Sequence, residues 1–217
     1  MNTAKLFRKG AEASLYRGEW FGRQAVFKVR HSREYRHPSL DYKLRVTRTA
    51  REAHIISTAK KAGIKTPLLF EIDFPQTTLI MEYVEGLLLR DVVSDTPRET
   101  LKRLFSEVGA AIGRLHNYGI IHGDLTTSNM INIQNHQLCF IDFGLASFSS
   151  ETESRGVDLL LAKRTLSSSH PLVFETCFKA LTTSYRKIVP AGREVISKIG
   201  EIEKRGRYVE RAAASNS

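Results

Sequence analysis

The sequence contains little cysteine and no long apolar segment. Its 217 residues include two cysteines, Cys139 and Cys177, without metal-ligand spacing around them. This excludes a disulfide framework and a cysteine-rich zinc site. No apolar run approaches the roughly 18 residues of a membrane-spanning helix, and the N-terminal MNTAKLFRKG lacks the apolar core of a signal peptide. We therefore expect a soluble, cytoplasmic protein with no membrane partner.

Acidic residues are scarce relative to basic ones. The sequence has 33 Lys and Arg against 23 Asp and Glu, for a net charge of +10. This excess suits a polyanionic partner such as nucleic acid, and equally suits an ordinary basic, solvated surface. Hydrophobic residues make up 41% of the chain. That is enough for a core, and we expect one compact domain with two lobes.

The hydrophobic pattern changes along the chain. The segments SLYRGEW, RQAVFKVR, LLFEIDF and TTLIMEYV read as strands, with Gly22 at the first turn and a loop at HSREYRHPSLD. Helical spacing covers Asp41 to Ala62, Pro97 to Tyr118 and the chain after Ser154, with a polar tail from Arg207. MINI and QLCFID read as a hairpin. The pattern predicts a strand-rich part followed, from near Gly86, by a mostly helical part.

Glu52 lies on an apolar helix stripe with Ile55, Ile56 and Ala59. A buried carboxylate needs a cation, and the best candidate is Lys28 in AVFKV, where strand alternation turns it away from solvent. The competing interpretation is a solvated glutamate at the edge of the stripe. Glu52 alone favours this second interpretation.

Polar residues interrupt the apolar stretch around HGDLTTSN. Asp124 and Asn129 lie five residues apart in this loop, and Asp142 follows the next apolar strand in IDFG. Two acids and an amide in neighbouring loops form an oxygen-rich site. Such a site suits Mg²⁺ shared with phosphate.

Lys28, Glu52, HGDxxxxN and DFG occur in the order and spacing of the protein-kinase-like superfamily, which the chain resembles over nearly its whole length. KGAEASLY, YRHPSLD, LRVTRTAREA, HGDLTTSN, IDFGLA, VDLLLAKR and a late RGR make it similar to a smaller family. This is the small atypical kinase/ATPase subunit of the KEOPS complex, which acts in threonylcarbamoyladenosine formation on tRNA. The resemblance implies a single α+β domain over 1–217. It would comprise a β-rich N-lobe at 1–85, a reduced helical C-lobe at 86–206 and a basic tail at 207–217.

The resemblance also assigns roles. Lys28 would hold the α- and β-phosphates of ATP and pair with Glu52, and Asp124 would be the catalytic base or orient the nucleophile. Asn129 and Asp142 would bind Mg²⁺, and His122 would pack beneath the loop. The remaining nucleotide contacts would come from the phosphate-facing segment and the linker MEYVE: Gly10, Ala11, Glu12, Ala13, Ser14, Glu82 and Val84.

Several departures from protein kinases narrow the expected function. GAEAS keeps one glycine of the usual glycine-rich loop and puts Glu12 close to the phosphates. Gly123 replaces the arginine that meets a phosphorylated activation loop, so control of that kind is not expected. No APE motif follows IDFG, and the sequence after it is short for a peptide-binding subdomain. We therefore expect a kinase of narrow scope that mainly hydrolyses ATP and is completed by a partner.

The family implies three partners: a threonylcarbamoyl-transferase subunit, a small regulatory subunit on the N-lobe, and tRNA. Lys204, Arg205 and Arg207 are the candidate tRNA contacts. Without the resemblance, a solvated helix end explains them as well. Two other functions stay open: a free-standing small-molecule or protein phosphotransferase, and a pseudoenzyme scaffold or RNA-binding module.

Overall fold

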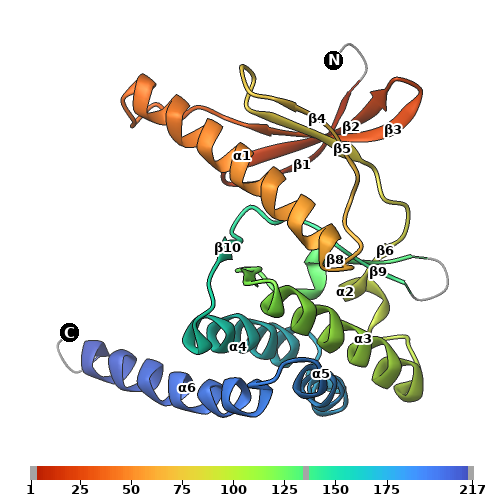
Figure 1. Cartoon of the computed structure of the whole chain (residues 1–217), viewed down its shortest axis with the longest axis vertical. Coiled ribbons are helices and arrows are strands. Elements are labelled where there is room, and N and C mark those ends of the chain that lie inside the picture. Colours follow the sequence, from red (N-terminus) through yellow and green to blue (C-terminus); the bar gives the residue numbers. More distant parts are fainter. Residues whose placement is uncertain (1–3, 134–136, 215–217) are drawn as a thin grey trace. The chain divides into compact units, whose positions relative to one another are not determined.

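The computed structural model describes residues 4–133 and 137–214, and for 206–214 the backbone alone. The chain divides into two compact units, the first Met1–Lys61 with Lys65–Glu85 and the second Ala62–Ile64 with Gly86–Ser217. Strands dominate the first unit and helices the second (Figure 1). The predicted α+β class is confirmed, whereas the expected limits of the lobes and tail stay predictions. No helix among the described residues is long and apolar enough to cross a membrane.

The first unit is a five-stranded antiparallel sheet with one helix. The sheet order is β1-β2-β3-β5-β4. Its elements are β1 (Lys5–Lys9), β2 (Ala13–Trp20), β3 (Arg23–Arg30), α1 (Pro38–Lys61), β4 (Leu69–Asp73) and β5 (Thr78–Glu82). Phe21 and Gly22 turn β2 into β3 with positive φ angles of 45° and 76°, as a tight two-residue hairpin requires. The predicted strands and the turn at Gly22 are confirmed.

Two apolar clusters stabilise this unit. Ala53 of α1 packs with Leu79 and Met81 of β5. Ala25, Phe27 and Ile80 form a second cluster within the sheet.

α1 begins at Pro38, three residues before the predicted start, so the expectation of a loop through Asp41 is wrong. Proline fits a first helical turn because the missing N–H needs no partner there.

The second unit combines short strands with four long helices. The short strands are β6 (Leu87–Leu88), β7 (Ile120–Ile121), β8 (Met130–Asn132), β9 (Leu138–Phe140) and β10 (Ser147–Phe148). Two short helical segments, α2 (Leu89–Val92) and the 3₁₀ helix η1 (Thr127–Asn129), lie between them. The longer helices are α3 (Arg98–Asn117), α4 (Thr152–Ser169), α5 (Phe174–Ile188) and α6 (Gly192–Ala214). β8 and β9 pair antiparallel, which confirms the predicted hairpin. Residues 134–136 at its tip lie outside the described residues.

α3 is the centre of the helical packing. It buries a stripe that includes Leu101, Leu104, Val108 and Ile112, as the spacing predicts. α5 crosses it so closely that a Cβ at Gly109 would lie 2.1 Å from a backbone oxygen of α5. This packing sets a rigid base for β7 and the loop that follows, where the predicted catalytic residues lie.

Candidate nucleotide and catalytic site

A buried ion-pair network in the first unit links β3 to α1. Lys28 Nζ lies 2.6 Å from Glu52 Oε1, and Arg30 Nη2 lies 2.5 Å from Glu52 Oε2. Glu52 is 2% exposed, which confirms the buried, paired interpretation over the solvated one. Arg30 is a second partner that the sequence analysis missed. Its signal was present, because residues two apart on a strand share a face.

The segment Gly10–Ser14 forms the β1–β2 turn and the start of β2. The Gly10 N–H donates to the Ala13 carbonyl at 2.9 Å, which closes the turn. The Glu12 carboxylate lies 2.5 Å from Arg48 of α1 and 3.8 Å from Arg30. Ser14 Oγ lies 2.8 Å from His31 Nε2. One ion pair thus holds the turn to α1 and another to the end of β3, and its contact with phosphate stays a prediction.

The linker residues follow β5 directly. The Glu82 N–H donates to the Leu68 carbonyl at 2.8 Å, and the Leu68 N–H donates to Glu82 Oε2 at 3.0 Å. The Tyr83 N–H donates to the Gln24 carbonyl at 3.1 Å. Val84 is half-buried. These bonds fix the backbone of the linker, while contact of Glu82 and Val84 with adenine stays a prediction.

In the second unit the loop after β7 brings Asp124 and Asn129 together. Asn129 Nδ2 donates to Asp124 Oδ2 at 2.7 Å and to the Asp124 carbonyl at 3.0 Å. Asn129 is 3% exposed and closes the η1 turn. The two bonds fix the orientation of the amide, so its Oδ1 is turned away from Asp124. Asn129 thereby fixes the position of the Asp124 carboxylate and leaves its own Oδ1 for another ligand.

Asp142 follows β9 at a point tied to the same loop. The Ile141 N–H donates to the Asn129 carbonyl at 2.9 Å, so the residue before Asp142 is bonded to Asn129. Asp142 has φ of +60°, which is uncommon for a residue other than glycine, and its Oδ1 accepts from the Gly144 N–H at 3.3 Å. Residues with such φ angles cluster at functional sites and also occur in turns, as Phe21 and Thr77 do here.

The donor atoms fit Mg²⁺ in the way that the family implies. An amide oxygen of Asn129 and the carboxylate of Asp142 are hard oxygen ligands, and Mg²⁺ takes few of these from protein when phosphate and water supply the rest. No group of three or more His, Cys, Asp or Glu that could hold a metal occurs within the described residues. A site shared with a nucleotide fits this better than a closed protein cage.

His122 lies buried under the loop and packs against Phe143. It is 1% exposed, and its ring centroid lies 4.7 Å from that of Phe143. Burial lowers the pKa of His122, although the carboxylates of Asp158, Asp142 and Asp124 act in the opposite direction. The Asp124 N–H approaches His122 Nδ1 at 3.3 Å. The ring is therefore neutral near pH 7 and packs as the sequence analysis expects.

Asp158 lies in α4 and is hydrogen-bonded to this loop, and the sequence analysis missed it. Its Oδ2 accepts from the His122 N–H at 2.8 Å, and its Oδ1 accepts from the Gly123 N–H at 2.8 Å. Oδ2 also lies 3.2 Å from His116 Nε2, and His116 Nδ1 lies 2.8 Å from the Tyr185 hydroxyl. Asp158 is 2% exposed. The signal in sequence was an aspartate within the otherwise apolar VDLLLA.

Gly123 occupies the position where protein kinases have arginine, and the backbone explains the glycine. Its φ is +76°, and an added Cβ would lie 2.5 Å from the Leu145 carbonyl oxygen. Any larger side chain would displace either this loop or the segment that follows Asp142.

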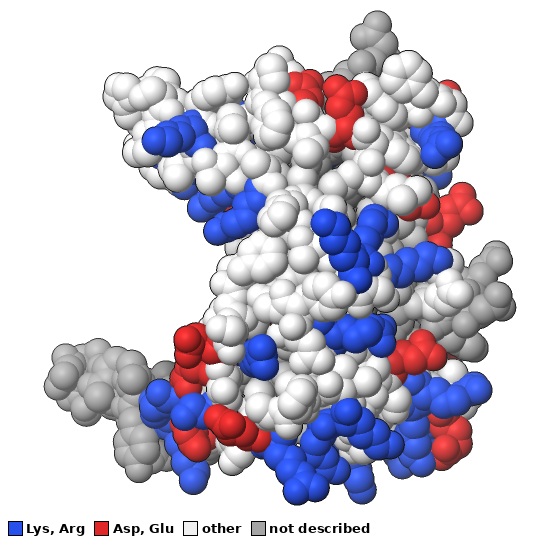
Figure 2. All heavy atoms as spheres, in the orientation of Figure 1, with Lys and Arg blue, Asp and Glu red and all other residues white. Residues whose placement is uncertain are grey.

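Of the basic residues near the C-terminus that are predicted to contact tRNA, one already forms an ion pair within the chain. Figure 2 shows Lys and Arg over much of the visible face of the helical unit, with Asp and Glu among them. Arg205 is paired with Glu153, while Lys204 is exposed. The side chain of Arg207 lies outside the described residues. Contact of the three residues with tRNA stays a prediction.

An Asp–Asn pair in HGDxxxxN, an Asp in DFG and a buried Lys–Glu pair, each described within its own unit, are features typical of the protein kinase class. A family model described as "Protein kinase domain" matches residues 9–169. The chain is 44% identical to the KEOPS complex subunit Bud32 of Pyrococcus abyssi, over 96% of this chain and 98% of that protein. The chain therefore belongs to the protein kinase family and, within it, to the Bud32 family.

Other relatives include longer proteins. The chain is 49% identical to a probable bifunctional tRNA threonylcarbamoyladenosine biosynthesis protein of Methanothermobacter thermautotrophicus, over 94% of this chain but 37% of that protein. It is 36% identical to the EKC/KEOPS complex subunit Tp53rkb of Mus musculus, over 94% of this chain and 86% of that protein. The chain thus spans little more than a third of the bifunctional relative.

Proposed function

We propose that this chain is an Mg–ATP-dependent atypical serine/threonine kinase that works mainly as an ATPase. Its working context would be a KEOPS-type complex that supports threonylcarbamoyladenosine modification of tRNA in the cytoplasm. The observation that carries the proposal is the Asn129–Asp124 pair, because it holds a carboxylate ready to take a proton beside an amide oxygen suited to a metal. The names of the related proteins, a KEOPS complex subunit and a tRNA threonylcarbamoyladenosine biosynthesis protein, support this setting.

Each residue has a simple task in the proposed reaction. Lys28, fixed by Glu52, places a positive charge for the α- and β-phosphates. Asp124 accepts the proton of the attacking hydroxyl or water, and Asn129 keeps its carboxylate in position. Asn129 and Asp142 would hold Mg²⁺, which would supply positive charge to the phosphate oxygens. Phosphoryl transfer depends mostly on positioning and charge, so these groups suffice.

The partners follow from the same context. We assign a threonylcarbamoyl-transferase subunit, a small regulatory subunit on the first unit, and tRNA, with Lys204, Arg205 and Arg207 as its contacts. The Arg205–Glu153 pair must open if Arg205 is to meet a phosphate. Because that pair is exposed, opening it costs little.

The test is ATP hydrolysis by the chain alone, with the transferase subunit, and with the transferase subunit and tRNA. Asp142→Asn is the active-site variant, and Asp95→Asn, an exposed aspartate in a turn, is the matched control. We expect turnover to rise with the partners in the native chain and the control, and to fall to background in Asp142→Asn.

Two results would contradict the proposal. Turnover indifferent to both partners would favour a free-standing phosphotransferase. Failure to bind Mg–ATP at all would favour a scaffold or RNA-binding module.

A further inference from the structure

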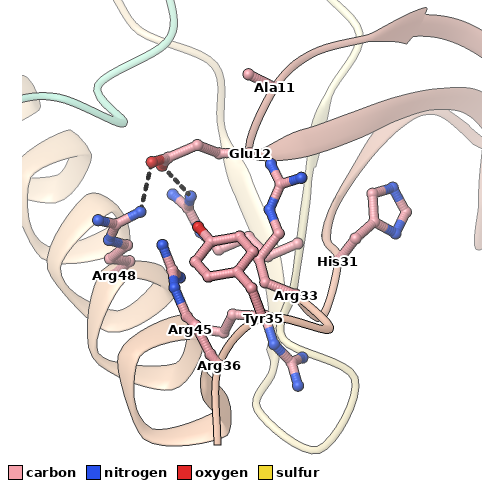
Figure 3. A pocket seen from close by; sticks show the side chains of 9 residues that line it. Ala11, Glu12, His31, Arg33, Tyr35, Arg36, Arg45 and Arg48 are labelled. Atoms are coloured by element: carbon pink, nitrogen blue, oxygen red, sulfur yellow. Dashed lines mark hydrogen bonds and ion pairs between the residues drawn. The ribbon is translucent and has the colours of Figure 1, made fainter. Parts of the chain in front are cut away.

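The first unit contains a cavity with five arginines in its lining. Its volume is about 180 Å³, and its arginines are Arg30, Arg33, Arg36, Arg45 and Arg48. They come from the end of β3, from the loop before α1 and from α1 itself. The β1–β2 turn adds Glu12, and Tyr35 lies among the guanidinium groups (Figure 3). Lys28, the predicted nucleotide contact, does not line this cavity.

The carboxylates nearby do not balance these cations. Asp41 Oδ2 lies 2.7 Å from Arg45 Nε, and Asp41 Oδ1 lies 3.6 Å from Arg36. Arg45 is also the main reason that the pKa of Asp41 is lowered. Glu12 pairs with Arg48 and Arg30. Three carboxylates, those of Glu12, Asp41 and Glu52, thus serve the five arginines and Lys28.

The five arginines exceed these three carboxylates by two, so two positive charges are in excess around one small cavity. Within the described residues the Arg33 guanidinium makes no hydrogen bond or ion pair. Cations that converge without compensation repel one another, and an anion bound among them relieves this repulsion. The cavity is built for a negative ligand.

The size and the walls select a class of anion. The cavity volume of about 180 Å³ is far more than a single water needs, so a phosphate group fits within it. Walls from three separate segments suit the free end of a molecule better than a chain that continues on both sides. Guanidinium groups bind phosphate in a bidentate manner, and a monoester offers three oxygens and nearly two charges.

We propose that this arginine pocket binds a phosphomonoester dianion at a site separate from the nucleotide residues. The carrier is either free phosphate or a phosphorylated side chain, which offer the same group. Arg30 connects the pocket to Glu52, the residue that also holds Lys28. A dianion that attracts Arg30 therefore changes the surroundings of Lys28. This last consequence rests on the proposed function, whereas the binding itself does not.

The test is titration calorimetry of the full chain with inorganic phosphate, with a phosphoserine peptide and with the same peptide unphosphorylated. Arg33→Ala and Arg36→Ala remove half-buried pocket arginines whose loss leaves the core intact. Arg51→Ala is the matched control, because Arg51 is exposed on α1 and does not line the pocket. Lys28→Met tests the nucleotide site. We expect affinity for the phosphorylated probes to fall about tenfold in both pocket variants and to be unchanged in Arg51→Ala. Lys28→Met should change it by less than the pocket variants do, because its only link to the pocket is the Glu52 carboxylate that it shares with Arg30.

The carriers and the contrary results are distinguishable. Tighter binding of the phosphopeptide than of phosphate would identify a phosphorylated protein as the carrier, and the reverse would identify free phosphate. Loss of binding in Lys28→Met with none in Arg33→Ala would overturn the proposal, because the anion would then occupy the nucleotide site. An equal loss in Arg51→Ala, or binding only of an RNA oligomer without a terminal phosphate, would overturn it as well. None of these measurements needs ATP turnover, so failure of the proposed function would be seen separately.

Discussion

Replacing Asp158 by asparagine tests how the catalytic loop is held. Both carboxylate oxygens of Asp158 accept backbone N–H groups, one from His122 and one from Gly123, each at 2.8 Å. An amide of the same shape can accept only on its oxygen side. Its NH₂ group must then face one of the two donors, and the loop before Asp124 has to move or leave that donor unpaired.

The expected size follows from burial. Asp158 is 2% exposed, and a buried donor without a partner costs about 1–3 kcal/mol. We expect Asp158→Asn to lower the free energy of unfolding by that amount. A misplacement of about 1 Å in a catalytic group costs on the order of 100-fold in rate. We therefore expect kcat for ATP to fall about 10- to 100-fold, with little change in KM because Asp158 is a positioning residue.

The assay pairs ATP turnover, with the transferase subunit and tRNA present, with urea unfolding of the same variant. Asp95→Asn serves as the control for the change of charge. A variant that loses stability as expected but keeps the kcat of the control would refute this reasoning. Asp158 would then stabilise the fold without setting the position of Asp124.

Three further changes have defined outcomes. Glu52→Gln leaves two buried cations with a neutral partner and should lower the free energy of unfolding by about 3–5 kcal/mol, whereas the exposed Glu107→Gln should have almost no effect in the same urea titration. Gly123→Ala should cost about 1–3 kcal/mol more than Gly22→Ala and also slow turnover, because both have φ of +76° but only the first meets a carbonyl oxygen at 2.5 Å. His122 has a lowered pKa, so the unfolded chain takes up its proton first and stability should fall as pH drops below about 6.5; His122→Gln should flatten that slope in unfolding measured from pH 8 to pH 5.

The sequence predicts best where a residue breaks a hydrophobic period. Asp124 within an apolar run indicated a partner, and the structure supplies Asn129. Glu52 on an apolar stripe named Lys28 as its best candidate cation, although Glu52 alone favoured a solvated side chain, and the structure pairs the two. Gly22 and its flanking strands were predictable because the residue types that form a turn are adjacent in the sequence. Such features need only a few neighbouring residues to be recognised.

What the sequence did not predict depends on contacts between distant segments. Asp158 lies 36 positions after His122, and nothing local shows that its carboxylate meets that backbone. Arg30 and Lys28 lie on the same face of β3, and the sequence does not show which of the two cations reaches Glu52. In the structure both of them pair with it. The arginine pocket joins a turn, a loop and a helix, and each of these looks like an ordinary basic surface in sequence.

The same contacts explain how the catalytic loop keeps its shape without an arginine before Asp124. At position 123 the close Leu145 carbonyl admits glycine alone, so no side chain there can reach a phosphorylated residue. The loop is instead bonded through Asp158 to α4, and through His116 and Tyr185 to α3 and α5. All three of these side chains are at most 2% exposed. Because a buried network of this kind forms when the helices pack, the loop is held by folding and needs no arginine at position 123 to meet a phosphorylated residue.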